Sequence, residues 1–219
     1  MIRFCKTLAV ASLSALLLVG PANSADTNDD LRKFVVSLSS DDGMKISEAQ
    51  MLATKSEEST LPERLHNVAL QEEFRSPQTW FVSVNAPDQS AVEQYLSELA
   101  IEPMSVYESL FVNSPEVGGG PKAGDAPKEG HNVYMIQRDL PGIGLAPLDK
   151  MVAVSEGSQK IIESLDGKVE WDHSFLTSEG TFCVYRAGDP SMIEEHARIA
   201  GIPANPITEV EHIVRNFSF

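Results

Sequence analysis

Residues 81–93 read FVSVNAPDQSAVE and residues 182–194 read FCVYRAGDPSMIE, so the second stretch lies over the first without a gap at an offset of 101 positions (182 − 81). Each stretch combines a strand pattern, an Ala-x-Asp turn and the beginning of a helical pattern. At the same offset Ile101 meets Ile202, and Val106 meets Ile207. This internal repeat indicates that the chain contains two copies of one structural unit.

The two copies are separated by a segment of different composition. Residues 114–130 contain Gly118-Gly119-Gly120, three prolines and mixed charges, without apolar periodicity. This composition is typical of a flexible linker. We therefore place a first, degenerate copy at residues 30–113 and a second copy at residues 131–219.

The second copy predicts the element order β-α-β-β-α-β. Strand patterns cover residues 133–138, 169–176, 181–186 and 207–214, and helical spacing of apolar residues covers 145–165 and 190–200. Asp189 is suited to cap the second helix, with Pro190 at its first position. Trp171, His173 and Phe175 alternate with polar residues, so we expect these three side chains to share one face of their strand.

A small sheet with both helices on one face leaves its other face apolar and open, and that face must be buried. A second copy on the same chain can bury it. The predicted fold class is therefore α+β: tandem ferredoxin-like (βαββαβ) repeats packed sheet to sheet as an intrachain dimeric α+β barrel, with a cavity between the sheets. In the first copy the second strand, near residues 68–75, is unusual because it carries many charges.

The first 24 residues predict a removable signal peptide. Arg3 and Lys6 precede an apolar run over residues 8–19, and Ala22-Asn23-Ser24 supplies small residues for cleavage before Ala25. The run is short for a membrane span, although an uncleaved N-terminal anchor is the alternative. We therefore expect a periplasmic or secreted protein.

The charge and the cysteine content exclude several classes of binding partner and an internal disulfide. The formal net charge is −15, and removal of Arg3 and Lys6 brings it to −17 (−15 − 2). This charge repels phosphate backbones and anionic lipids, so we expect no nucleic-acid partner and no membrane binding after signal removal. Cys183 is the only cysteine left after cleavage and has no internal disulfide partner. Pairing of the copies within one chain would permit a monomer, and a homodimer is the other assembly considered.

Four segments of the second copy resemble the DUF4242, or nickel-binding ferredoxin-like, family. They are Val133–Arg138 with Leu140-Pro141-Gly142, then WDHSFL at residues 171–176, then CVYRA at residues 183–187, and finally Glu195-His196-Ala197 followed by Gly201-Ile202-Pro203 and ITEV at residues 207–210. The resemblance covers about 80 residues, all in the second copy. It implies a dimeric ferredoxin-like architecture and, in some relatives, bound nickel, but no established enzymatic activity.

The sequence departs from the family pattern in both copies. Gly188 stands where the family usually has proline, whereas Pro87 occupies that place in the first copy. The first copy has Tyr95 at the position of His196 and Val82 at the position of Cys183. The chemistry of that histidine and cysteine can therefore occur only once per chain.

The candidate metal ligands are His173, His196, Cys183 and His212. Imidazole suits nickel, zinc and copper, and a neighbouring thiolate favours zinc or Cu(I). The alternative for each is a buried structural side chain, and His131, beside the linker, is expected to be solvated. The histidines lack the spacing of a dedicated local metal motif, so any site must be assembled by the fold.

Three functions compete on this evidence. The first is an exported binding protein for nickel, another divalent transition metal or a small molecule held between the sheets. The second is a structural or interaction module without a site, which the loss of His and Cys in the first copy favours. The third is a small α+β-barrel enzyme that uses a cavity histidine beside an enclosed pocket.

Overall fold

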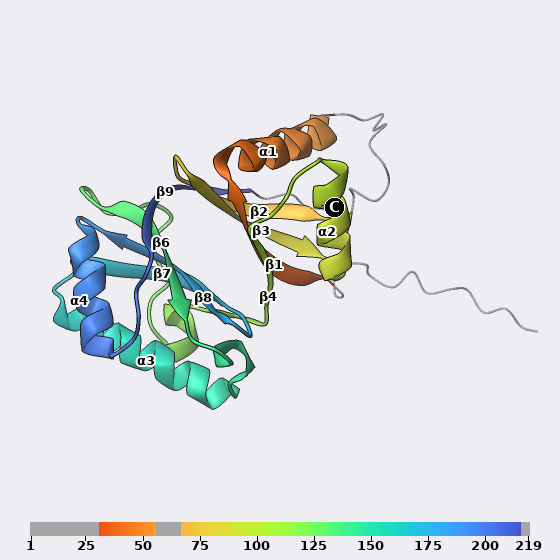
Figure 1. Cartoon of the computed structure of the whole chain (residues 1–219). Coiled ribbons are helices and arrows are strands. Elements are labelled where there is room, and N and C mark those ends of the chain that lie inside the picture. The colour runs from red at the N-terminus through yellow and green to blue at the C-terminus, as the bar shows by residue number, and fades with distance from the viewer. Residues whose placement is uncertain (1–30, 56–66, 216–219) are drawn as a thin grey trace, which may run out of the picture.

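The computed structural model in Figure 1 describes residues 31–55 and 67–215. The predicted signal peptide, residues 1–24, lies outside the described residues. Within the described ranges no helix combines the length and apolarity needed to span a bilayer.

The chain forms two successive βαββαβ units. The first consists of β1 (Arg32–Ser39), α1 (Ser40–Lys55), β2 (Ala69–Arg75), β3 (Thr79–Ala86), α2 (Gln89–Glu98) and β4 (Ser105–Ser109). Then come the short strand β5 (Phe111–Asn113) and the 3₁₀ helix η2 (Pro115–Gly118). The second unit consists of β6 (Asn132–Asp139), the 3₁₀ helix η3 (Ile143–Leu145), α3 (Leu148–Ser164), β7 (Val169–Leu176), β8 (Gly180–Ala187), α4 (Pro190–Ala200) and β9 (Ile207–Val214). The element order predicted for the second copy is therefore confirmed.

The repeated Ala-x-Asp turn begins a helix in both units. The carboxylate of Asp88 accepts a hydrogen bond from the backbone N–H of Ala91, and that of Asp189 accepts one from Ser191. Each bond satisfies a donor that the first helical turn cannot pair internally. Gly201 then ends α4 in the left-handed conformation, at φ 66°, which glycine adopts without steric cost.

The nine strands of the described residues form one sheet in the order β4-β1-β3-β2-β9-β6-β8-β7-β5. Each unit contributes the ferredoxin-like order of its fourth, first, third and second strands. The units join because β9 pairs with β6 through residues 207–210 and with β2 through residues 211–214. In the same way, residues 105–109 pair with β1 and residues 111–113 pair with β7. Since β4 and β5 are separated only by Leu110, the two ends of the strand order are linked and the sheet curls into a barrel.

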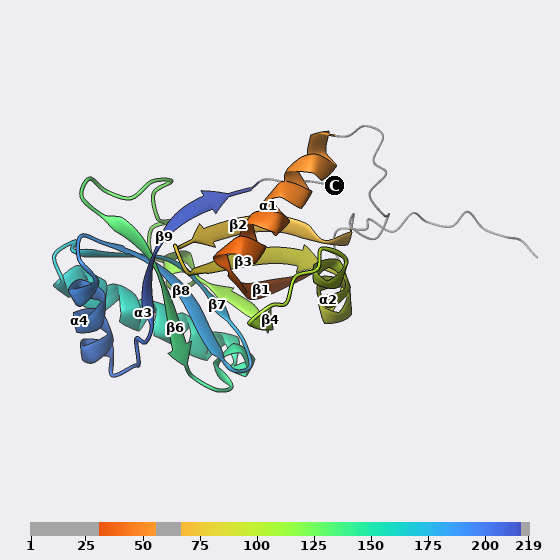
Figure 2. The ribbon, with the colours of Figure 1, turned by 45° about the horizontal axis from the view of Figure 1, so that its top comes forward.

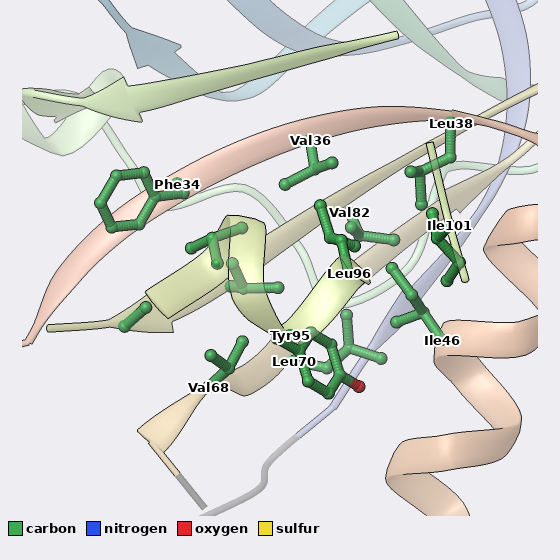
Figure 3. Close-up of a cluster of buried hydrophobic side chains, with 13 residues drawn as sticks. Phe34, Val36, Leu38, Ile46, Val68, Leu70, Val82, Tyr95, Leu96 and Ile101 are labelled. Atoms are coloured by element: carbon green, nitrogen blue, oxygen red, sulfur yellow. The ribbon is translucent and has the colours of Figure 1, made fainter. Parts of the chain in front are cut away.

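Residues 31–55 and 67–215 contain three apolar clusters. One lies between α1, α2 and the first sheet half, where Figure 3 shows Leu38, Val82 and Tyr95 packed together. A second lies between α3, α4 and the other sheet half, and includes Tyr134, Trp171 and Ile193. The third lies between the two sheet halves, which meet in Figure 2 with their helices on the outside. Its members come from both units: Val35, Phe74, Phe81, Met135, Phe175, Phe182, Val184 and Val210. The sheet-to-sheet packing predicted from the sequence is thus confirmed.

A β-bulge occurs at the same place in both units. The pairing of β2 with β3 shifts between Leu70 and Glu72, and the pairing of β7 with β8 shifts between Trp171 and His173. The extra residue reverses the alternation of side chains. Trp171 therefore packs under the helices whereas Phe175 packs inside the barrel, so the expectation that Trp171, His173 and Phe175 share one face is wrong for Trp171.

The segment between the copies is packed against the second unit. The hydroxyl of Ser155, on α3, donates to the carbonyl of Ser114 and accepts from the N–H of Gly118. Further along, the carbonyl of Gly124 accepts a hydrogen bond from Arg186. These contacts fix a segment whose composition had predicted flexibility, because buried polar side chains elsewhere satisfy its backbone groups.

Candidate functional site: a polar cavity inside the barrel

A cavity of about 730 Å³ lies inside the barrel at the edge of the third apolar cluster. It falls within the range typical of small-molecule sites, ~300–1,000 Å³. Both units line it, as does the segment between them. The first unit contributes Lys33 and Glu72, the strand β5 contributes Val112, and the segment between the units contributes residues 122–125. The second unit contributes Asp172, His173, Phe175, Arg186, His212 and Arg215.

Glu72 is the centre of the polar lining. Its Oε2 lies 2.9 Å from Nε2 of His212, within hydrogen-bonding distance, and 3.4 Å from Nε2 of His173. The second distance permits ionic attraction, but Nε2 of His173 makes no hydrogen bond to any described residue. Two imidazoles from different strands of the second unit therefore converge on one carboxylate oxygen of the first unit.

A second carboxylate holds the other side of His173. Oδ1 of Asp172 lies 3.1 Å from Nδ1 of His173, and its Oδ2 accepts a 2.5 Å hydrogen bond from Arg186. The guanidinium of Arg186 is itself anchored at the carbonyl of Gly124. This chain of contacts fixes the orientation of the His173 ring, as carboxylates do for imidazole ligands in metal sites.

Aromatic side chains form the floor of the site. The rings of His212 and Phe74 are stacked, with centroids 4.4 Å apart and an interplanar angle of 14°. The ring of His173 meets Phe175 edge-on at 4.8 Å. Both phenylalanines are fully buried, so they separate the polar site from the rest of the barrel interior.

The electrostatic environment favours the ionised carboxylates. Burial by itself raises the pKa of Glu72, but the hydrogen bond from His212 and the nearby charges of His173 and Lys33 outweigh it, so this pKa lies below its ordinary value. The pKa of Asp172 is likewise lowered, since His173 and Arg186 outweigh the effect of burial. Burial lowers the pKa of Lys33 despite the attraction of Glu72. Negative charge is thus retained beside the two imidazoles.

The donor atoms around Glu72 suit a transition metal ion. Neighbouring nitrogen and oxygen ligands at bond lengths of ~2.0–2.2 Å are separated by about 3.0–3.4 Å. The separations of Glu72 from His212 and His173 are of that size. Nevertheless, the described part of the chain contains no group of three or more His, Cys, Asp or Glu side chains already placed to hold an ion. Binding would therefore require the donors to rotate together.

The four predicted metal ligands do not form one site. His173 and His212 lie in the barrel cavity with their ring centroids 6.2 Å apart. Cys183 and His196 line a different pocket, between the second sheet half and the helices α3 and α4. The sheet separates the two pairs because Cys183 belongs to the cluster under the helices whereas its neighbour Val184 faces the barrel.

His131 is not solvated, contrary to expectation. Only 13% of its side chain is exposed, and its Nδ1 lies 3.1 Å from Glu170. Lys128 also pairs with Glu170, so this cluster ties the segment between the copies to β7. Its role in the structure is that of an anchor outside the cavity.

Sequence reasoning missed Glu72, Asp172 and Arg186. In the sequence, Glu72 is one of many charges on an unusual strand. The repeat did contain a signal, because Glu72 stands 101 positions before His173 (173 − 72) and the matching bulges place both at equivalent positions. Residues related by a pseudo-twofold axis lie near each other only where both are close to that axis, and the 3.4 Å separation of Glu72 and His173 shows that these two are.

The fold and the cavity define a class: an α+β protein built of two ferredoxin-like repeats closed into one barrel, with a ligand-sized cavity between the sheet halves. Residues 134–210 match the family model described as nickel responsive protein SCO4226-like. The match runs from β6 into β9, so the second unit is similar to this family, in agreement with a nickel-binding ferredoxin-like second half. No curated protein sequence matches the chain.

Solved structures resemble the chain in fold only. A mutant of chlorite dismutase from Candidatus Nitrospira defluvii has a TM-score of 0.45 at 8% identity, over 84% of this chain and 91% of that chain. The same enzyme in complex with imidazole has a TM-score of 0.45 at 8% identity, over 83% and 90%. A heme-binding protein from Thermus thermophilus has a TM-score of 0.40 at 7% identity, over 84% and 91%.

Proposed function

We propose that this protein is an exported binding protein that takes up a divalent transition metal ion, nickel first among the candidates, in the barrel cavity. The observation that carries the proposal is the convergence of the two Nε2 atoms of His173 and His212 on Oε2 of Glu72. The similarity of residues 134–210 to a nickel responsive family supports the choice of metal.

The chemistry of the donors fits this function. Imidazole nitrogen is a good ligand for nickel, copper and zinc, and the carboxylate of Glu72 adds a negative charge. Asp172 holds Nδ1 of His173, which leaves Nε2 free for an ion. The side chains of His173, His212 and Glu72 are only 14%, 11% and 17% exposed, so few water molecules would compete at the site.

The test is calorimetric titration of the chain from Ala25, without a histidine tag, with Ni²⁺, Zn²⁺ and Cu²⁺. We expect one ion per chain with micromolar or tighter affinity, and at least tenfold weaker binding in His212→Ala and Glu72→Gln. His131→Ala is the matched control, because that histidine is also carboxylate-paired but lies outside the cavity. Equal affinities in the wild-type chain and both cavity variants would refute the site.

The size of the cavity favours a second candidate, a small organic ligand. A volume of about 730 Å³ greatly exceeds the space of one ion. Lys33 lines the cavity and would favour an anion, whereas Arg186 and Arg215 are already paired with Asp172 and Glu73. Native mass spectrometry of the untagged protein would distinguish the candidates, because an organic ligand adds a mass that chelator treatment does not remove.

A further inference from the structure

The second unit contains a separate pocket on the other side of its sheet. It has a volume of about 350 Å³ and lies between β6, β7, β8 and the helices α3 and α4. Its wall is mostly apolar and includes Leu140, Ile143, Val154 and Ile161. Several polar side chains interrupt that wall, among them Arg138, Cys183 and His196. The proposed metal site uses none of them.

Arg138 is buried, and the described wall of the pocket around it offers the weakly acidic side chains of Cys183 and Tyr185 but no carboxylate. Its side chain belongs to a residue that is 4% exposed, and its Nη1 donates to the carbonyl of Pro203. Its Nη2 has no hydrogen-bond partner among the described residues, and no carboxylate of residues 31–55 or 67–215 forms an ion pair with it. A guanidinium remains charged at any physiological pH, and a buried charge without a partner is costly. An anion in the pocket would remove that cost.

His196 supplies a second unused polar atom. The residue is fully buried, and its Nε2 lies 3.2 Å from the hydroxyl of Ser158. Its Nδ1 has no partner among the described residues. When the Ser158 hydroxyl donates to Nε2, the neutral ring carries its proton on Nδ1 and can donate it. Arg138 and His196 both lie against the ring of Tyr185. The guanidinium carbon of Arg138 is 5.8 Å from the centroid of that ring, and the ring centroids of His196 and Tyr185 are 5.2 Å apart.

The first unit shows that the fold does not require these polar groups. Strand pairing places Leu38 at the position of Arg138, and the repeat places Val82 and Tyr95 at the positions of Cys183 and His196. Those three side chains are buried in an apolar core, as Figure 3 shows. The second unit therefore has arginine, cysteine and histidine where the same architecture is stable with an aliphatic and aromatic filling.

We propose that this helix–sheet pocket binds a small organic acid, with its carboxylate on Nη2 of Arg138 and Nδ1 of His196 and its short apolar tail along Leu140, Ile143 and Ile161. The volume lies at the lower end of the range for small-molecule sites, so the ligand is a short aliphatic or single-ring acid. The carboxylate satisfies both unused donors, and the tail replaces water on the apolar wall.

The test is calorimetric titration of the chain from Ala25 with octanoate, and with octan-1-ol as the matched neutral ligand. We expect saturable binding of octanoate, and octan-1-ol binding at least tenfold weaker. Arg138→Met removes the charge but retains an apolar side chain of similar length, and should weaken octanoate binding at least tenfold without weakening octan-1-ol binding.

A second variant blocks the pocket without removing a polar group. Gly157 lies on α3 and lines the pocket, and a Cβ added there would meet no atom within 4 Å. Gly157→Leu should therefore fill the pocket and abolish binding of both ligands, while it favours the helix because glycine is a poor helix former. His212→Ala, in the barrel cavity, should leave octanoate binding unchanged.

The proposal would be overturned by the absence of saturable octanoate binding, by equal binding of octanoate and octan-1-ol, or by octanoate binding that both Arg138→Met and Gly157→Leu leave intact. Loss of octanoate binding in His212→Ala but not in Gly157→Leu would place the acid in the barrel cavity and would also overturn it. The metal titration is independent of each result, because the two sites share no lining residue.

Discussion

Acid should destabilise this protein through His196 well before its carboxylates are protonated. Burial, with a smaller contribution from the positive charge of Arg138, lowers the pKa of His196 from 6.5 to about 4. The residue is fully buried in the folded chain, whereas the unfolded chain exposes it to water. Between these two pKa values the unfolded state binds a proton that the folded state does not, so stability falls as the pH falls.

The magnitude follows from the two pKa values. The difference between the unfolded and folded pKa values of His196, at about 1.36 kcal/mol per pH unit, corresponds to about 3 kcal/mol in the free energy of unfolding. The protein has lost about 2 kcal/mol of that stability when the pH has fallen to 5. The window between pH 7.5 and pH 5 is informative, because the pKa values of Glu72 and Asp172 lie below their ordinary values of 4.5 and 3.8. Those carboxylates therefore contribute to stability throughout this range and lose their contribution only as the pH falls below it.

The assay is urea unfolding of the wild-type chain and of His196→Gln at pH 7.5, 6 and 5. Glutamine retains a polar side chain that does not titrate, so the difference between the two pH profiles isolates His196 from the other histidines. We expect the wild-type chain to lose about 2 kcal/mol more than the variant across this range. Parallel profiles would refute the reasoning, since they would mean that His196 binds its proton equally well in the folded and unfolded states.

Three further predictions test the barrel and its packing. Phe74→Ala should lower the free energy of unfolding by about 3–5 kcal/mol in urea titration, because Phe74 is fully buried and stacks on His212; a cost below about 1 kcal/mol would contradict the inter-sheet core. Gly180→Ala should lower the free energy of unfolding by about 1–3 kcal/mol in the same urea titration, because the added Cβ would overlap the carbonyl oxygen of Arg138. An unchanged urea midpoint would show that this turn can move to make room for the Cβ. Trp171→Phe removes the buried 2.9 Å hydrogen bond to Ser174, so it should lower the melting temperature and cost about 1–3 kcal/mol of stability. Adding Ser174→Ala to Trp171→Phe should then cause little further loss of stability, because the two side chains share that one bond.

The internal repeat by itself determined most of the fold. Offsets of about 101 residues matched strands, turns and helices between the copies, and strand and helix periodicity predicted the elements of the second unit within a few residues. These features are local in origin: apolar periodicity, the Asp189 cap and the Gly201 stop depend on residues within a few positions of one another. The burial of an open sheet face by its partner then followed from the amphipathic pattern.

Only the tertiary structure decided which residues share a site. The four predicted ligands separate into two pairs because β8 presents Cys183 and Val184 to opposite faces of the sheet. The bulge at Asp172 moved Trp171 away from the face of His173, and a single extra residue of this kind leaves no reliable trace in an alternating pattern. Glu72 joined the site from 101 positions away, across a strand pairing between β2 and β9 that no local signal specifies. The sequence thus determined the two units and their candidate residues, whereas the closure of the barrel decided which of those residues meet, since contacts between distant strands depend on register and packing of the whole sheet.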